Sequence, residues 1–137
     1  MNRHKKLNIN IDVRFRDIDS MGHVNNAVFF TYFEEGRKAF LHTLFNIIEP
    51  EDYSFILAHI SCDFLRPVKL VDSIRLQLWI GEIGGERFNI KYSLVNSSDE
   101  SLVYAKGQSV QVFFDYKKNR TVPISKYFME KISDYIE

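Results

Sequence analysis

The chain has little cysteine: Cys62 is the single thiol among its 137 residues. One cysteine cannot form an intramolecular disulfide, and no cysteine pair is present to bind a metal ion. The first residues, Met-Asn-Arg-His-Lys-Lys, lead into alternating polar residues and do not resemble the apolar core of a secretory signal. We therefore expect a protein of the reducing cytoplasm.

Long apolar runs and an excess of either charge are also missing. No stretch approaches the roughly 18 consecutive apolar residues that a membrane-spanning helix requires. Eighteen basic side chains balance 18 acidic ones, so no overall electrostatic field attracts nucleic acid or an anionic membrane. Repeats and low-complexity tracts are absent as well. These absences predict a soluble protein without nucleic-acid or membrane partners, and the length predicts a single domain over residues 1–137.

Hydrophobic periodicity predicts the first strand and the first helix. Apolar and polar residues alternate from Leu7 to Phe15, which is typical of a half-buried strand. Over residues 26–45 the spacing changes to three or four, which is typical of an amphipathic helix. The residues that recur at this spacing are Phe29, Phe33, Gly36, Phe40 and Leu44. Gly36 indicates close packing of this helix on a sheet, because glycine inside a helix costs up to ~1 kcal/mol relative to alanine.

The rest of the chain up to Phe114 predicts four further strands, separated by short turn sequences that favour antiparallel connections. Their ranges are 53–65, 73–83, 87–96 and 101–114. After Pro123, Ser125 is placed to cap a final helix that carries Phe128, Ile132 and Ile136 on one side. The order β-α-β-β-β-β predicts an α+β fold in which a curved antiparallel sheet wraps around one long central helix, followed by a C-terminal helix.

Residues 17–26, Asp-Ile-Asp-Ser-Met-Gly-His-Val-Asn-Asn, connect the first strand to the long helix. A loop that leads into a helix offers unpaired backbone N–H groups and a positive dipole end, which suit an oxyanion. Asp17 and Asp19 lie within a few residues of those groups, so the same loop offers a base. A turn or cap role is the alternative for Asp19, and a solvated or arginine-paired carboxylate is the alternative for Asp17.

This loop and three further segments carry a resemblance to a known family. The further segments are Phe30, Tyr32, Glu34 and Arg37 in the helix, then residues 63–68 and 70–74. Together with the element order, they resemble the hotdog fold and, within it, the 4-hydroxybenzoyl-CoA thioesterase family. The version Gly-His-Val-Asn-Asn is similar to the branch that hydrolyses medium- and long-chain fatty acyl-CoA. The resemblance implies an enzyme that hydrolyses acyl-CoA and needs neither a metal nor a cofactor beyond the coenzyme A of its substrate.

The resemblance also implies roles for the loop residues. The carboxylate that corresponds to Asp19 either attacks the thioester carbonyl or deprotonates a water that does, and the sequence leaves both mechanisms open. The oxyanion donor of the family is a backbone group, which corresponds here to the Asn26 N–H, with Asn25 beside it. Gly22 permits the turn before the helix, and His23 is expected mainly to position the loop.

Substrate-binding residues are expected on both sides of the loop. The expected acyl-pocket residues are Phe29, Phe30 and Phe33, and core packing is the alternative for each. The cations expected to hold the phosphates of coenzyme A are Arg66 and Arg87, with Lys69 and Lys106 as further candidates. Solvated charges at strand edges are the alternative for these cations.

Three other groups of residues are of types that can act as base, nucleophile or metal ligand. Glu34 and Glu35 are rival bases, because some hotdog thioesterases carry the catalytic carboxylate in the long helix; helix-surface ion pairs are the alternative. Cys62 alternates with apolar residues inside a strand, so an inert thiol is expected. The histidines show no ligand spacing, so no metal is expected.

Two alternative functions remain open, and the chain is expected to assemble with further copies of itself. The same fold serves hydratases of hydroxyacyl thioesters, which His23 near Asp19 would suit, and non-catalytic acyl-CoA sensors. An uncovered strand edge invites pairing, and hotdog relatives are oligomers, so we expect a homodimer or homotetramer with the site spanning two protomers. The residues leave open the acyl chain length, an aromatic preference, and acyl carrier protein in place of coenzyme A.

Overall fold

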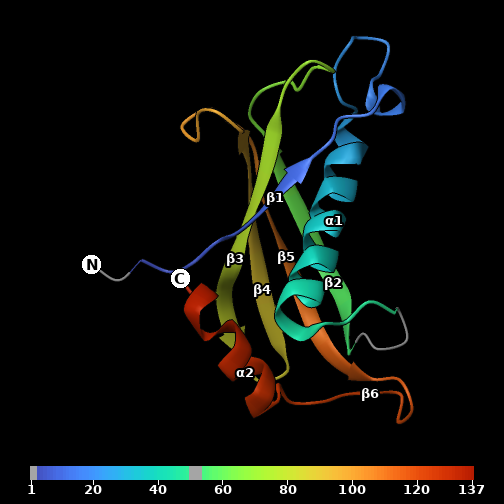
Figure 1. Ribbon diagram of the computed structural model, residues 1–137. Coiled ribbons are helices and arrows are strands. Elements are labelled where there is room, and N and C mark those ends of the chain that lie inside the picture. The colour runs from blue at the N-terminus through green and yellow to red at the C-terminus, as the bar shows by residue number, and fades with distance from the viewer. Residues whose placement is uncertain (1–2, 50–53) are drawn as a thin grey trace.

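A computed structural model describes residues 3–49 and 54–137 of the chain. Five strands form an antiparallel sheet in the order β1-β3-β4-β5-β2, β6 pairs with β5, and a long helix, α1, lies along one face (Figure 1). The strands are β1 (Leu7–Ile11), β2 (Phe55–Phe64), β3 (Ile74–Gly84), β4 (Arg87–Asn96), β5 (Val103–Asp115) and β6 (Arg120–Thr121). The helices are α1 (Asn26–Phe45) and α2 (Lys126–Ile132), with single 3-10 turns at Phe15–Asp17 (η1) and Ser133–Tyr135 (η3). The structure confirms the predicted α+β class and, within residues 3–49 and 54–137, one long helix.

Helix α1 occupies the predicted range because both of its ends have local signals. The side chain of Asn25 accepts a hydrogen bond from Ala27 N at 2.9 Å, which caps the first turn. At the other end Asn46 adopts a left-handed conformation with φ of 55°, which ends the helix. Between these ends Gly36 lies against β3, where an added Cβ would be 2.6 Å from Leu76 Cδ2. The expected close packing of the helix on the sheet is confirmed.

The first strand is shorter than the alternation predicted. β1 ends at Ile11, opposite Ile74, and β3 has no earlier residue with which the chain could continue to pair. The backbone then leaves the sheet and forms η1. Phe15, which was expected on the buried face, is 82% exposed as a result, while Asp17 is buried.

Near the C-terminus the structure departs from the prediction at β6, which was not predicted, and at Ile136. Position 53, which was predicted as part of the second strand, lies outside the described residues. Ser125 caps α2 as expected, by accepting a hydrogen bond from Phe128 N at 3.1 Å. Ile136, expected on this helix, instead forms a parallel bridge with Ile80, because the chain is extended after η3.

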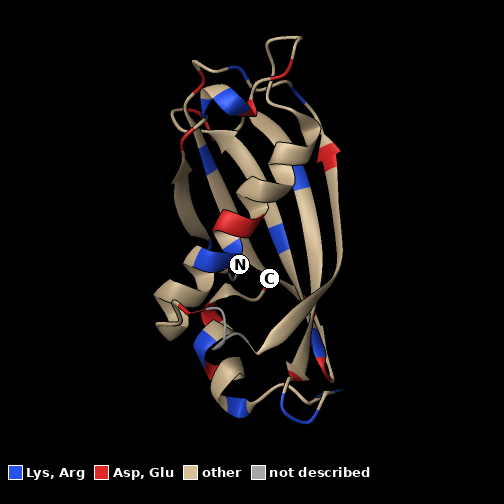
Figure 2. Ribbon diagram, turned by 90° about the vertical axis from the view of Figure 1, so that its right-hand side faces the viewer, with Lys and Arg blue, Asp and Glu red and all other residues tan. Residues whose placement is uncertain are grey.

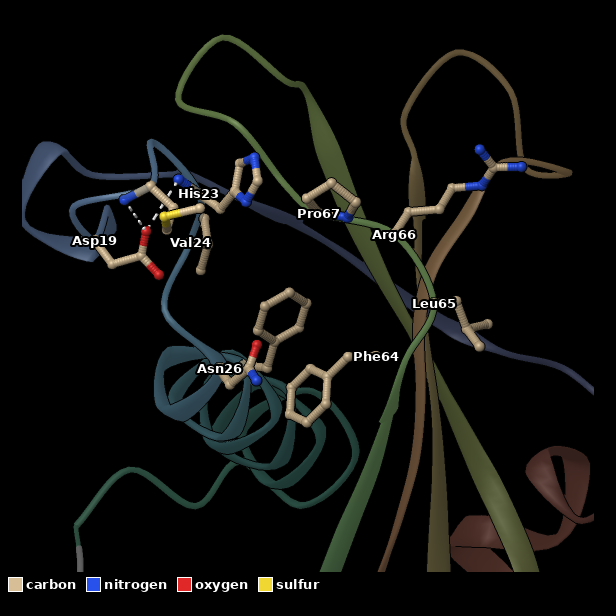
Figure 3. A pocket seen from close by; sticks show the side chains of 10 residues that line it. Asp19, His23, Val24, Asn26, Phe64, Leu65, Arg66 and Pro67 are labelled. Atoms are coloured by element: carbon tan, nitrogen blue, oxygen red, sulfur yellow. Dashed lines mark hydrogen bonds between the residues drawn. The ribbon is translucent and has the colours of Figure 1, made fainter.

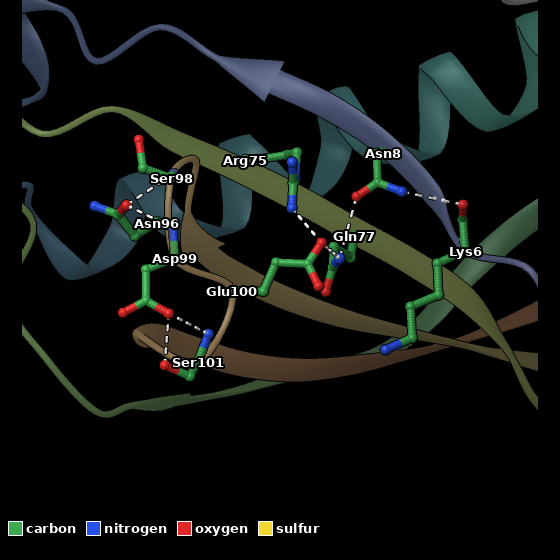
Figure 4. A network of polar contacts seen from close by, with 9 residues as sticks. All are labelled: Lys6, Asn8, Arg75, Gln77, Asn96, Ser98, Asp99, Glu100 and Ser101. Atoms are coloured by element: carbon green, nitrogen blue, oxygen red, sulfur yellow. Dashed lines mark hydrogen bonds and ion pairs between the residues drawn. The ribbon is translucent and has the colours of Figure 1, made fainter.

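On the face of the sheet opposite α1, polar side chains hold the β4–β5 connection against β3 and link β3 to β1. Glu100, in the β4–β5 connection, pairs with Arg75 and accepts a hydrogen bond from Gln77 Nε2 at 3.2 Å (Figure 4). Gln77 Nε2 also lies 3.2 Å from Asn8 Oδ1 on β1. These contacts connect a loop to two strands.

Charged residues of both signs occur at both ends of the molecule, so the charge balance of the sequence is also a balance in space (Figure 2). Neither sign occurs alone at one end of the molecule in this view (Figure 2). Within the described ranges, no helix combines the length and the apolar character that crossing a membrane would need.

Candidate functional site

A cavity of about 230 Å³ lies where the loop before α1 meets the segment that follows β2 (Figure 3). The two segments are joined by a hydrogen bond from Val24 N to Val68 O at 2.8 Å. Five of the residues predicted for the site line this cavity: Asp19, His23, Asn26, Phe29 and Arg66. Folding therefore brings the loop, the helix start and an arginine from a different connection to one place.

One carboxylate oxygen of Asp19 stabilises the turn of the loop, and the other has no hydrogen-bond partner among the described residues. Its Oδ1 accepts hydrogen bonds from Met21 N at 2.9 Å and His23 N at 3.3 Å (Figure 3). Its backbone also closes the loop, since Asp19 N donates to His23 O at 2.8 Å and Gly22 N donates to Asp19 O at 3.0 Å. Asp19 Oδ2 has no protein partner among the described residues. The turn interpretation of this aspartate is present in the structure, and it uses only one of the two carboxylate oxygens.

Gly22 makes the loop conformation accessible. Its φ of 80° lies in the left-handed region that side chains disfavour, whereas the space around it is open, with no atom within 4 Å of an added Cβ. The requirement for glycine is therefore conformational rather than steric. The resulting tight turn carries the chain from Asp19 back to the helix start.

The amides around the helix start are not equivalent. Four of them donate to oxygens of the chain, namely those of Val24, Asn25, Ala27 and Val28. The Asn26 N–H has no acceptor within residues 3–49 and 54–137, and Asn26 lines the cavity. The first N–H groups of a helix carry the positive end of its dipole. Of the amides of residues 24–28, the structure leaves that of Asn26 for an anionic group in the cavity.

His23 and Arg66 lie on opposite segments of the cavity wall. His23 is half-buried, and in the described part of the chain its imidazole has no hydrogen-bond partner. Arg66 is exposed, and its backbone N–H donates to Tyr104 O at 3.1 Å, which anchors the segment after β2. The guanidinium is therefore accessible to an anion at the cavity mouth.

The three predicted acyl-pocket phenylalanines have different environments. Phe29 lines the cavity and contacts Phe64 edge to face, with ring centroids 5.1 Å apart. Phe30 also meets Phe64, at 6.3 Å, but does not itself line the cavity. Phe33 is fully buried and stacks on Tyr92 at 4.4 Å. For Phe33 the structure shows the alternative interpretation, core packing.

Other predicted residues lie away from the cavity. Arg87 is the first residue of β4, directly after the β3–β4 turn. This turn lies at the opposite end of the sheet, where Ile124 N donates to Gly85 O at 3.1 Å (Figure 1). Lys106 lines a separate cavity of about 140 Å³. Asn25 acts as the helix cap. The residues Lys69, Glu34 and Glu35 do not line the cavity beside Asp19 either.

Five lining residues were missed by the sequence reasoning for the site: Met21, Val24, Phe64, Leu65 and Pro67. Met21 and Val24 lie inside the loop that was singled out, so their presence follows once the loop closes. The others lie some 40 residues downstream, in a segment that only the family resemblance marked. Periodicity assigns Phe64 to a strand but does not show which loop that strand end will meet.

Asp17 is buried and bonded, which corrects its expected environment. Its Oδ2 accepts hydrogen bonds from Tyr32 O–H at 2.8 Å and Arg14 N at 2.9 Å, so it is neither solvated nor paired with an arginine side chain. Burial, and then the bond to this carboxylate, raise the pKa of Tyr32 far above its usual range. Tyr32 therefore remains a protonated donor.

In the described part of the chain, no group of three or more histidine, cysteine, aspartate or glutamate side chains is arranged to hold a metal ion. The polar groups that the cavity offers are the carboxylate of Asp19, the N–H of Asn26, the imidazole of His23 and the guanidinium of Arg66. A carboxylate and a free N–H are groups of the kind that can serve as base and as oxyanion donor in acyl transfer to water.

An antiparallel sheet that packs along one long helix is the hotdog fold, as found in thioesterases. The chain belongs to the thioesterase-like superfamily, whose model matches residues 13–132.

Named relatives include thioesterases with different acyl groups. The 1,4-dihydroxy-2-naphthoyl-CoA hydrolase of Nostoc punctiforme is 33% identical over 89 residues, which are 62% of this chain and 60% of that protein. The long-chain acyl-CoA thioesterase FadM of Escherichia coli is 23% identical, over 93% of this chain and 97% of that protein. A thioesterase of Thermus thermophilus, solved with coenzyme A and Zn, is 30% identical with a TM-score of 0.78 and covers 91% of this chain and 90% of its own.

Proposed function

We propose that this protein is an acyl-CoA thioesterase that hydrolyses fatty acyl-CoA, with medium and long chains favoured, to the free acid and coenzyme A. The observation that carries this proposal is the convergence of the Asp19 carboxylate and the free Asn26 N–H on one cavity. Relatives that hydrolyse acyl-CoA support the reaction class. The preference for fatty chains rests on the Gly-His-Val-Asn-Asn sequence of residues 22–26.

In the proposed mechanism the thioester carbonyl carbon lies near Asp19 Oδ2, and its oxygen accepts the Asn26 N–H. As base, Asp19 takes a proton from water while the water oxygen bonds to the carbonyl carbon; as nucleophile, its own oxygen forms that bond and water later hydrolyses the anhydride. Collapse of the oxyanion breaks the C–S bond and releases the thiolate. The Asn26 N–H stabilises the charge on the oxygen during this step. In the base route the thiolate takes up the proton held by Asp19; in the nucleophilic route the attack of water breaks the C–O bond of the anhydride, restores the Asp19 carboxylate and supplies the proton.

The substrate is proposed to lie across the two segments that form the cavity. Arg66 at the mouth suits a phosphate of coenzyme A, since guanidinium groups bind phosphates through paired hydrogen bonds. Phe29 and Phe64 offer an apolar wall to the acyl group. His23 is proposed to position the loop, and the reaction needs neither a metal nor a separate cofactor.

A second copy of the chain is proposed to complete the site. Among the described residues, β2 is an edge strand whose one partner is β5. Phe64 and Leu65, which line the cavity, are 41% and 53% exposed, and Leu57 on the same strand is 44% exposed. Pairing of β2 with a second β2 would cover this apolar edge and enclose the cavity, giving a homodimer or homotetramer.

The test is thiol release from acyl-CoA esters from acetyl to palmitoyl, with benzoyl added, by wild type and by Asp19→Ala. We expect turnover by wild type and a loss of at least ~100-fold in Asp19→Ala. Asp115→Ala is the matched control, because Asp115 Oδ1 also accepts two backbone N–H groups, from Lys117 and Lys118, far from the cavity. This control is expected to retain activity.

Other outcomes would replace parts of the proposal. Full activity in Asp19→Ala would mean that Asp19 is not the base, and Glu34 or Glu35 would be the next candidates. Tight acyl-CoA binding by an inert wild type would indicate a sensor. Conversion of an enoyl thioester with the thioester left intact would indicate a hydratase, for which His23 beside Asp19 would supply the second group.

A further inference from the structure

Asp17, at the start of the loop before α1, and Tyr32, within α1, form a buried hydrogen-bonded pair. We propose that this pair is a positioning device that holds the loop so that the Asn25 N–H is occupied and the Asn26 N–H is left for the substrate. The inference rests on the proposed function, and it assigns to the first aspartate of the loop a role different from that of Asp19. Neither Asp17 nor Tyr32 lines the cavity, so both act through other groups.

Asp17 contacts both ends of the loop and the helix that follows it. Its backbone oxygen accepts a hydrogen bond from Asn25 N at 2.9 Å, at the point where the loop ends. Its Oδ2 accepts the hydrogen bonds from Arg14 N at the loop entry and from Tyr32 O–H within α1. A single residue therefore fixes the loop entry, the loop exit and their position relative to the helix.

The pair is buried enough to hold its geometry. Asp17 is 8% exposed and Tyr32 is 2% exposed, so water competes little for their hydrogen bond. A carboxylate that accepts from two donors in such a site constrains the peptide that follows it. Without the side-chain bonds, the Asp17 carbonyl would be free to turn from Asn25, and two adjacent amides would then compete for the substrate oxygen.

Both side-chain bonds converge on the same carboxylate oxygen, Oδ2. Asp17 Oδ1 has no partner among the residues the structure describes. An asparagine at this position can therefore keep both bonds by placing its amide oxygen where Oδ2 lies, although it carries no negative charge. This geometry separates a positioning role, which the substitution Asp17→Asn would preserve, from a chemical role, which needs the ionised carboxylate.

The test compares Asp17→Ala, Asp17→Asn and Tyr32→Phe by steady-state hydrolysis of the best acyl-CoA substrate. We expect kcat to fall by ~10- to 100-fold in Asp17→Ala and Tyr32→Phe, with KM changed by less than ~3-fold, because the donor is misplaced while binding remains. Asp17→Asn is expected to recover kcat to within ~3-fold of wild type. The double variant Asp17→Ala/Tyr32→Phe should lose little more than either single variant.

Tyr104→Phe is the matched control, because it also removes one buried tyrosine hydroxyl, which accepts from Asn96 Nδ2 at 3.2 Å. It is expected to lose stability comparable to that of Tyr32→Phe and to keep kcat. An Asp17→Asn variant as inactive as Asp17→Ala would overturn the proposal in favour of a chemical role for the carboxylate. Unchanged kcat in Tyr32→Phe and Asp17→Ala would overturn it as well.

A second measurement does not depend on turnover. Amide hydrogen exchange of Asn25 is expected to be slow in wild type and Asp17→Asn, and at least ~10-fold faster in Asp17→Ala and Tyr32→Phe, because the bond to Asp17 O is released. If every variant and wild type are inert on all thioesters but exchange follows this pattern, the proposed function fails and the positioning pair stands. If exchange is the same in all four proteins, the positioning pair fails.

Discussion

Phe33 packs directly against Gly107, where β5 has no side chain to separate it from helix α1. A Cβ added at Gly107 would lie 2.8 Å from Phe33 Cζ and 2.8 Å from Ser61 O. Real Cβ atoms do not approach other heavy atoms this closely, so even alanine requires the ring or the strand to move. The absence of a side chain at one position thus sets how closely the helix approaches the strands beside the site.

Gly107→Ala is therefore expected to lower the free energy of unfolding by ~1–3 kcal/mol, as overpacking of a core does. Urea denaturation followed by circular dichroism measures this change. Gly84→Ala is the matched control, because Gly84 is also in a strand but has no atom within 4 Å of an added Cβ. Equal stability of Gly107→Ala and wild type would show that the helix can shift without cost.

Replacement of Asn26 by proline tests the oxyanion donor directly. Proline lacks the N–H and fits the first position of a helix, and Asn25, at φ −61° and ψ 138°, has the conformation that a residue before proline adopts. We expect Asn26→Pro to lower kcat by ~100- to 1,000-fold with a melting temperature near that of wild type. Asn26→Ala keeps the N–H and should stay within a few-fold of wild type. Retained activity in Asn26→Pro would place the donor elsewhere.

Glu137 predicts a pH-dependent contribution to stability. Hydrogen bonds from Lys91 and then Trp79 lower the pKa of its carboxyl below the ordinary 4.5. Because the folded-state pKa is the lower one, the contribution is present above about pH 4.5 and is lost as the pH falls through the folded value. We expect Glu137→Gln to be less stable than wild type at pH 7, by less than ~1 kcal/mol because the pair is exposed and screened.

The measurement is the melting temperature of both proteins between pH 7 and pH 3. The difference between wild type and Glu137→Gln should shrink toward acid and vanish once the carboxyl is protonated. Glu130→Gln provides the control, since Glu130 is exposed and its side chain has no partner in the described residues. A difference that persists unchanged at pH 3 would mean that packing rather than charge stabilises the Glu137 contact.

The thiol of Cys62 is expected to react slowly with alkylating reagents. Burial, with a smaller effect of the Asp63 charge, raises the pKa of its thiol to about 11. At pH 8 its thiolate fraction should be ~100-fold or more below that of a free thiol, and alkylation by iodoacetamide, followed by mass spectrometry, should be correspondingly slow. The rate should rise as the pH approaches 11, and Cys62→Ala should hydrolyse thioesters as wild type does. Rapid labelling at pH 8 would contradict this environment.

The range of α1 could be predicted because its determinants are local. The three- to four-residue spacing of its buried side chains and the cap at Asn25 lie within the helix itself. The alternation in the first strand failed after Ile11 for a non-local reason, because a strand continues only while its neighbour offers backbone partners, and β3 begins at Ile74. Phe15 continues the apolar alternation of the sequence, but it lies beyond the end of β1 and is exposed.

The sequence by itself determined the α+β element order, the long helix and the loop in which Asp19 precedes a helix N-terminus, since spacing and capping act within a few residues. Only the tertiary structure decided that Asn26 rather than Asn25 keeps a free N–H, and that Phe33 is core while Phe64 lines the cavity. These outcomes depend on which segments meet: Asp17 with Tyr32, or the loop with the chain after β2. Contacts between distant segments are set by how the whole sheet packs on the helix, and no local spacing encodes that packing.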